Sequence, residues 1–412
     1  MNYLRFMNEN WRFVGFGFFM SLSSSFGQTF YIALSGAEIR LEFGLTHGEF
    51  GFWFGVATIG SALSLIWLGR LIDYMDLRFY SLATCVGMIL SMLIIASAPG
   101  LFTLVVGLYL ARLCGQGLMT HISVTSMGRY FNFNRGKAVS IALMGQSLGE
   151  AILPTIVITF IIYLGWRDTW YVAAIFLGVT SVILVPYLMR GYSKIHLSYI
   201  KKQSIGTDTP SLTGKQWTRI EVLFDHRFYL IAAAVLSFSF IGTGLFFHQI
   251  HIASEKNWPL EILASAFVLY ALFKVITALL VGPLIDKFGC RPFLPLMLIP
   301  LAFTLIALAF FDSIYVAFIL FALLGISIGV LMPFTGAIWP QLYGTVHLGE
   351  IRSMMAALVA FSSAISPAIF GVMLDTGLTI EALSVVCLIY VIIITFLVSW
   401  VFVFSSRGSI GY

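Results

Sequence analysis

Twelve long apolar runs dominate this sequence and limit what it can fold into. Each run is about 20 residues or longer, and charged residues, proline or glycine separate it from the next. An α-helix of that length crosses the roughly 30 Å hydrocarbon layer of a bilayer. Only 10% of the residues are charged, against about 25% in soluble domains. The sequence therefore predicts an all-α polytopic membrane protein with twelve transmembrane helices.

The predicted helices fall into two groups of six. Their expected bounds are 12–36, 47–68, 79–98, 101–127, 137–163, 169–189, 226–252, 261–285, 292–311, 314–339, 352–374 and 380–404. Residues 191–225, between the sixth and seventh helices, are rich in basic residues, Ser, Thr and Gly, which is typical of a linker. We therefore expect two pseudo-symmetric six-helix bundles, over 1–190 and 226–412, joined by a cytoplasmic linker over 191–225.

Positive charge is distributed unequally between the two sides of the predicted membrane protein. Most of the 23 Lys and Arg residues fall in loops on the side that holds both termini, and only Arg40, Arg167 and Lys256 fall in loops on the other side. This bias predicts that both termini are cytoplasmic. We expect the protein to lie in the plasma (inner) membrane. The formal net charge of +5 is spread over these loops, so we expect the lipid bilayer, and no nucleic acid, as its partner.

One short pattern occurs in both halves, each time after the second helix. The copies read GRLIDYMDLR at 69–78 and GPLIDKFGCR at 282–291. In each copy Gly allows close helix contact, and Asp can accept N–H groups and pair with an Arg. Such a contact can form in one conformation and break in another, although either copy alone is also compatible with an ordinary charged turn. The predicted conformational gate consists of Gly69, Asp73, Arg78, Gly282, Asp286 and Arg291.

These motifs and the helix count resemble the major facilitator superfamily over essentially the whole chain. A second landmark, RYFNFNRGKAVSIALMGQSLGEAILP at 129–154, resembles the fifth-helix entry of the monocarboxylate porter and oxalate/formate antiporter branches. Drug/proton antiporters of the superfamily carry a Gly-Pro pair late in helix 5, whereas Pro154 follows Leu153 here. The resemblance implies two bundles of inverted three-helix repeats that rock around a central site near the bilayer midplane.

Three full charges fall inside the predicted spans, at Arg112, Glu150 and Lys274. Ionisable groups at this depth cost about 2.5 to 3.5 kcal/mol on insertion scales, so they are functional candidates. Arg112 and Glu150 both lie roughly 20 Å along their helices from the cytoplasmic end, so an ion pair is geometrically reasonable. The pair is either purely structural or supports proton coupling by Glu150. The string ARLCGQG at 111–117 resembles the fourth-helix signature of the superfamily, which implies a proton-coupling role for Arg112.

Lys274 is then left without an acidic residue inside the other predicted spans. A buried ammonium of this kind favours an anionic ligand, and the resembled branches place a substrate-binding cation on helix 8. Tyr270, four residues earlier, shares its helix face and can donate a second hydrogen bond to the same carboxylate. The alternative is that Lys274 reaches a water-filled vestibule or an interhelix carbonyl.

Further polar residues are second-rank candidates. Ser24, Gln28, Tyr31 and Ser35 have helical spacing, so they are predicted to line one face of the first helix toward a substrate cavity; the alternative is that they hold neighbouring helices together. Gln116 lies on the face of Arg112, and Gln146 on that of Glu150. His248, near the outer end of the seventh helix, is predicted to shuttle protons; the alternative is that it caps the outer vestibule.

No catalytic or nucleotide-binding signature occurs, so we expect neither an enzyme nor a cofactor or metal site. In particular, the chain lacks a G-x-x-x-x-G-K-[ST] loop for ATP. The leading hypothesis is a secondary active transporter for a small organic anion, above all a monocarboxylate, by proton symport or by antiport with a counter-anion. The alternatives are a drug/proton efflux antiporter and a non-transporting membrane sensor or partner-binding subunit.

Overall fold

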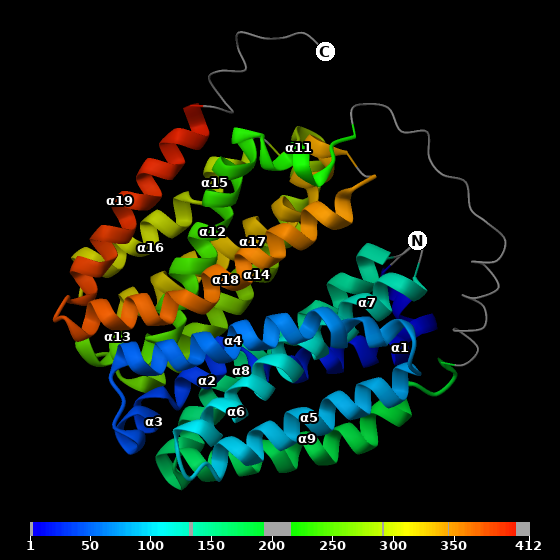
Figure 1. The fold of residues 1–412 in the computed structure, drawn as a ribbon, viewed down its shortest axis with the longest axis horizontal. Helices are drawn as coiled ribbons and strands as arrows, with labels where there is room; N and C mark the ends of the chain where they lie inside the picture. The colour runs from blue at the N-terminus through cyan, green and yellow to red at the C-terminus, as the bar shows by residue number, and fades with distance from the viewer. Residues whose placement is uncertain (1–2, 132–134, 193–215, 291, 345, 401–412) are drawn as a thin grey trace. The chain divides into compact units, whose positions relative to one another are not determined.

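The computed structural model describes residues 3–131, 135–192, 216–290, 292–344 and 346–400. All regular secondary structure in these ranges is helical, as Figure 1 shows from α1 in blue to α19 in red. The prediction of an all-α membrane protein is therefore confirmed.

Eleven helices in these ranges are long and apolar enough to cross a membrane. They agree with eleven of the twelve predicted spans to within a few residues. They are formed by α4 (His47–Leu68), α5 (Leu77–Ala96), α6 (Leu101–Ala111) with α7 (Thr120–Tyr130), α8 (Arg135–Leu164), α9 (Trp166–Leu188), α12 (His226–Phe247), α14 (Leu260–Phe288), α15 (Phe293–Leu296) with α16 (Ile299–Phe310), α17 (Tyr315–Tyr343), α18 (Leu348–Asp375) and α19 (Ile380–Ser399).

The first predicted span, 12–36, is interrupted rather than continuous. Helix α1 (Tyr3–Ser24) gives way to a 3-10 turn, η1 (Ser25–Gly27), and Gln28 is extended, with φ −78° and ψ 153°. The short helices α2 (Thr29–Leu34) and α3 (Gly36–Phe43) follow. The break lies where the backbone of Gly27 meets the fourth span: a Cβ atom at Gly27 would collide with the Ala111 carbonyl oxygen. Only glycine permits this approach.

The chain divides into two compact units. Unit 1 comprises residues 1–35 and 56–212, and unit 2 comprises residues 36–55 and 213–412. The boundary at 55 falls inside α4, so the first turns of that helix belong to unit 2. Within the predicted linker 191–225, residues 193–215 lie outside the described ranges. The linker ends in a short helix, α11 (Arg219–Leu223), which starts with a capping box.

Each unit is built from paired helices. In unit 1, α1 packs against α8 and α5 against α9; in unit 2, α12 packs against α18 and α16 against α19. The most extensive helix contact in unit 2 joins α14 and α17. At that contact, a Cβ atom on Gly325 would collide with the Tyr270 carbonyl oxygen, so the two backbones are very close. Small residues allow this kind of helix packing in membranes.

Candidate functional site

Arg112 lies at the helix break of unit 1. It begins an eight-residue π-helix, Arg112–Met119, between α6 and α7, and π-helical segments are frequent at functional sites. Its side chain is 2% exposed. Nε donates to Thr58 Oγ1 at 3.1 Å, and Nη1 donates to the Gly27 carbonyl oxygen at 3.3 Å and to Thr29 Oγ1 at 3.2 Å. The interrupted first span therefore supplies acceptors for this buried guanidinium. Gln116 lies half-buried in the same π-helix.

Glu150 is buried in the middle of α8, with 4% of its surface exposed. The side-chain amide of Gln146 donates to Glu150 Oε1 at 3.0 Å. This contact agrees with the face-sharing that their i, i+4 spacing predicts. The ion pair between Arg112 and Glu150, and the proton-coupling role of both residues, stay predictions.

The polar residues of the first span do not share one continuous helical face, because the helix is interrupted between them. Ser24 Oγ donates to the Ser21 carbonyl oxygen at 2.7 Å. The Tyr31 ring is buried and lies edge-on to the Trp170 ring, with 5.1 Å between the ring centroids. Trp170 Nε1 donates to Ser35 Oγ at 3.1 Å. These contacts hold α2 against α9, and the predicted substrate contacts of Ser24, Gln28 and Tyr31 stay predictions.

Lys274 and Tyr270 lie one turn apart on α14 of unit 2, and both are buried, with exposures of 7% and 6%. The Lys274 ammonium lies 5.7 Å from the centroid of the Tyr270 ring, a cation–π arrangement. The Tyr270 ring in turn lies edge-on to Phe246, with 5.1 Å between centroids. Phe267 packs nearby against Phe321. A buried ammonium beside an aromatic wall is thus the main polar feature of this helix.

The first copy of the repeated motif is an ion-paired turn. Residues Gly69–Asp73 form a 3-10 segment, η2, at the end of α4. Arg129, from the end of α7, pairs with the Asp73 carboxylate and donates through Nη1 to the Ile72 carbonyl oxygen at 3.1 Å. Arg78, within the motif, instead donates to the Met189 carbonyl oxygen at 3.2 Å. The Arg that pairs with Asp73 therefore comes from outside the motif, and the repeated pattern alone could not identify it.

The second copy has a different backbone conformation. Gly282 and the backbone of Asp286 belong to α14, which continues as a regular helix to Phe288. The side chain of Asp286 and the whole of Arg291 lie outside the described part of the chain. The gating role of both copies stays a prediction.

His248 lies just beyond the end of α12 and is 4% exposed. Its Nε2 atom donates to the Pro367 carbonyl oxygen at 3.0 Å. Burial holds the pKa of His248 at about 3, against the effect of the Pro367 hydrogen bond and with further lowering by His47, His251 and Arg40. The sequence singled out His248, but it gave no sign that His47 is its neighbour.

Lys256, assigned from the sequence only to an outer loop, is a buried charged residue of unit 2. Its Nζ atom lies 2.5 Å from both Asp312 Oδ1 and Glu381 Oε1. Burial by itself would lower the pKa of Lys256, but the hydrogen bonds to the two carboxylates outweigh it, and the pKa is raised. The three residues come from three separate loops and helix ends, so no local pattern could have found this cluster.

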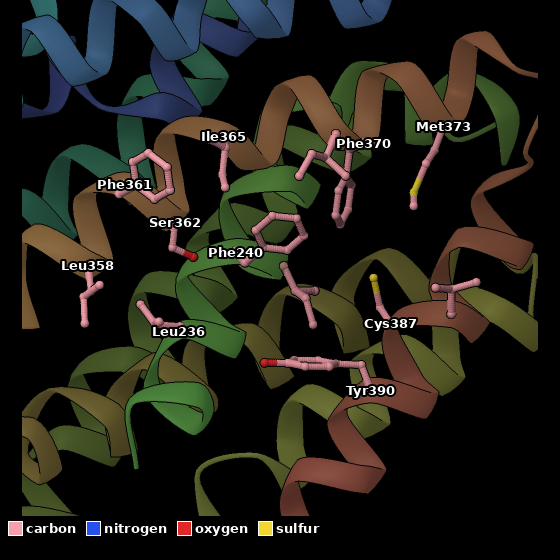
Figure 2. A pocket seen from close by; sticks show the side chains of 13 residues that line it. Leu236, Phe240, Leu358, Phe361, Ser362, Ile365, Phe370, Met373, Cys387 and Tyr390 are labelled. Carbon is pink, nitrogen blue, oxygen red and sulfur yellow. The ribbon is translucent and has the colours of Figure 1, made fainter. Parts of the chain in front are cut away.

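An apolar cavity of about 520 Å³ lies among α12, α18 and α19 of unit 2. Figure 2 shows Phe361, Phe370 and Met373 of α18 with Phe240 of α12 and Tyr390 of α19 around it. None of the residues singled out from the sequence lines this cavity. Its lining suits an apolar rather than a charged ligand.

The membrane-spanning helices and their buried charges are those of a polytopic membrane protein, and comparison with known proteins identifies its class. A family model described as "Major Facilitator Superfamily" matches residues 17–259 and 229–409. The chain belongs to this family and is a transporter rather than an enzyme. The predicted superfamily is thereby confirmed, whereas the monocarboxylate and oxalate/formate branch is not shown.

Solved structures share the fold at low sequence identity. One is described as a bacterial homolog to the human lysosomal transporter Spinster in an inward-facing and occupied conformation; it has 14% identity, a TM-score of 0.69, and coverage of 97% of this chain and 98% of that chain. A second, described as the unoccupied inward-facing form, has 14% identity, a TM-score of 0.67, and coverage of 94% and 96%. No curated protein matches the chain significantly.

Proposed function

We propose that the protein moves a small organic anion, above all a monocarboxylate, across the membrane by secondary active transport. The observation that carries the proposal is the balance of buried charge. In the described part of the spanning helices the fully charged residues that are buried are Arg112, Glu150 and Lys274, two cations and one carboxylate. Positive charge in a low-dielectric interior is expensive, and an anionic ligand reduces that cost.

Lys274 is the residue best suited to meet the anion. An ammonium group presents three donors on a flexible stem, so it can follow a ligand as the protein changes conformation. The Tyr270 ring beneath it stabilises the ammonium through its π-face, a contact that tolerates small movements of the cation. A carboxylate with a small apolar body fits the ammonium and the neighbouring aromatic wall.

Glu150 and Arg112 are the proposed coupling pair. Glu150 is a buried carboxylate whose contact with the Gln146 amide is retained in either protonation state, since a carboxylic acid still has an acceptor oxygen. Arg112 remains charged and positions the helix break beside it. Proton symport and exchange for a counter-anion are the two modes of coupling that this arrangement allows.

The similar solved structures support alternating access. They are described as occupied and unoccupied inward-facing forms of one transporter, which is the behaviour expected of a fold that carries a ligand through conformational states. A drug/proton efflux antiporter is the second candidate, favoured by the apolar cavity of Figure 2. The Leu153-Pro154 sequence, in place of the Gly-Pro pair of such antiporters, counts against it.

The test uses liposomes that contain the protein and the internal pH dye pyranine, at clamped voltage, with protein-free liposomes as the background. Small carboxylates are added outside, and in a second arm the liposomes are preloaded with the anion and uptake of the radiolabelled anion is measured, because anion exchange moves no proton that the dye could report. We expect one carboxylate class to give flux above background. Lys274→Gln should abolish that flux, whereas Lys287→Gln, an exposed lysine on the same helix, should leave it unchanged.

Normal carboxylate flux in the Lys274→Gln variant would show that the proposed anion site is wrong. Silence toward every carboxylate in both arms, with flux of amphipathic cations, would instead identify the efflux antiporter. Silence toward all solutes would favour a non-transporting membrane sensor or partner-binding subunit.

A further inference from the structure

Residues 36–55 of unit 2 contain α3 and the first turns of α4, and they pack against the ends of α13 (Gln249–Glu255) and α18. The Asp375 carboxylate at the end of α18 accepts the backbone N–H groups of His47 at 3.0 Å and Gly48 at 2.7 Å. It therefore caps the first turn of α4 with a negative charge. One turn on, a Cβ atom at Gly51 would collide with the Pro367 carbonyl oxygen, so the two helices pack tightly.

Three histidines meet at this contact. The His47 ring centroid lies 4.4 Å from that of His251 and 5.6 Å from that of His248. His248 donates to the Pro367 carbonyl oxygen, and His251 Nε2 lies 3.2 Å from Glu255 Oε2. The described His, Cys, Asp and Glu side chains form no group that could hold a metal ion. The imidazole ring is the side chain that exchanges a proton near neutral pH, so the ligand that suits three neighbouring histidines is a proton.

The charges around the cluster come from every element packed on it. They are Glu38 and Arg40 of α3, Glu49 of α4, Glu255 and Lys256 beside α13, and Asp375 of α18, with Asp312 and Glu381 held by Lys256. Arg40 disfavours a positive charge on each of the three histidines. Asp375 favours a positive charge on His47 and on His251, and Glu255 favours a positive charge on His251. Except for Glu38, whose Oε2 atom is buried without a hydrogen-bond partner, these carboxylates already bind backbone N–H groups or cations. They therefore compensate one added proton better than two or three.

We propose that His47, His248 and His251 form a proton-binding site whose occupation releases residues 36–55 from α13 and α18. The reason is repulsion and hydration: two imidazolium rings at the observed spacing repel one another, and the buried His248 ring can be hydrated only if the contact opens. The biological role of this site rests on the proposed transport function and deepens it. Release of residues 36–55 from α13 and α18 would link proton uptake to the conformational cycle of transport.

The direction of the pH dependence is set by burial. In the packed state burial holds the pKa of His248 at about 3 and lowers that of His251, although Glu255 opposes the second effect. In the released state the side chains return toward the ordinary histidine value of about 6.5. The released state therefore binds protons more tightly, so packing is strongest above that value and weakens as the pH falls. One histidine whose pKa is about 3 in the packed state and about 6.5 in the released state shifts the equilibrium between the two states about tenfold toward release at pH 5.5.

The test measures a distance rather than flux. Spin labels are placed on the full-length protein in lipid nanodiscs at Leu41 of α3, which is 83% exposed, and at Ser254 of α13, which is also exposed. The four native cysteines are buried, which limits their labelling. We expect a shift from pH 7.5 to 5.5 to increase the long-distance population about tenfold. The His47→Gln/His248→Gln/His251→Gln variant should lose that response. His347→Gln, a histidine beside Glu350 in unit 2, should keep it.

A wild-type distance distribution that does not change between the two pH values would overturn the proposal, and that measurement needs no histidine variant to fold. Retention of the full acid response in the triple variant, or in the double variant His248→Gln/His251→Gln, would do the same. Failure of anion transport with an intact distance response would refute the transport proposal and leave the proton-binding site standing.

Discussion

The two units hold their buried cations in different ways. In unit 1, Arg112 donates to acceptors from an interrupted helix and from α4, and the π-helix that it begins lies directly against Gly27. In unit 2, Lys274 lies on an uninterrupted helix with its ammonium over an aromatic ring. A rigid guanidinium with several acceptors helps to define the backbone around it, whereas a flexible ammonium over a ring keeps freedom to move. We therefore expect Arg112 to matter for structure and transport, and Lys274 mainly for transport.

The largest effect should come from Arg112→Gln. The change removes charge-assisted hydrogen bonds at a fully buried position and leaves the Gly27 carbonyl and two threonine hydroxyls to find new partners. We expect the free energy of unfolding to fall by about 3 kcal/mol, together with loss of flux. Thermal unfolding in detergent, compared with Lys274→Gln, measures this. If both variants lose the same stability, the distinction between the two cations is wrong.

A third buried cation, Lys256, sharpens the comparison. Its side chain is 1% exposed, while its partners Asp312 and Glu381 are 80% and 37% exposed. Water can therefore solvate the negative charges of the two carboxylates, but it cannot solvate the positive charge of the ammonium. Asp312→Asn with Glu381→Gln should cost about 3 kcal/mol because a buried charge is left without its counter-charges. Lys256→Met should lower the stability clearly less, because it removes the buried charge itself. If thermal unfolding shows equal losses of stability for the two variants, the buried ammonium is not the charge that sets the cost.

The two copies of the repeated motif also differ. Gly69–Asp73 forms a 3-10 turn whose Asp pairs with Arg129, whereas the equivalent residues from Gly282 continue α14. The same short sequence thus forms a turn in one half and helix in the other. The two helices end at different points: α4 ends before the first copy and Asp76, within that copy, caps the start of α5, while α14 ends only at Gly289, with a positive φ of 75°.

The smallest stability effect should come from Asp73→Asn. The Asp73 side chain is 56% exposed, and ion pairs of this kind contribute about 0 to 1 kcal/mol. We expect turnover to slow severalfold while substrate affinity and the melting temperature hardly change, because the pair stabilises one conformation of a moving turn. Flux as a function of substrate concentration separates these effects. A rise in apparent KM without a change in maximal rate would contradict the gating role.

The fold class, eleven of the spans and the three charges inside them could be predicted from local sequence. Apolar length and the cost of burying a charge are properties of short segments, and they add along the chain regardless of how the helices pack. The i, i+4 contacts Gln146–Glu150 and Tyr270–Lys274 could be predicted for the same reason, since helical geometry alone brings these side chains together.

Other features depend on residues far apart in sequence. The break at Gly27 arises because the fourth span lies against it, and Arg129 reaches Asp73 from the far end of that span. Residues 36–55 join the second unit through Asp375, more than 300 residues later, and thereby bring His47 to His248. Hydropathy specifies which segments enter the membrane. Hydropathy does not specify which backbones approach closely enough to interrupt a helix or to bring three histidines together. That is decided only when the helices pack, because such contacts depend on the shapes of both surfaces.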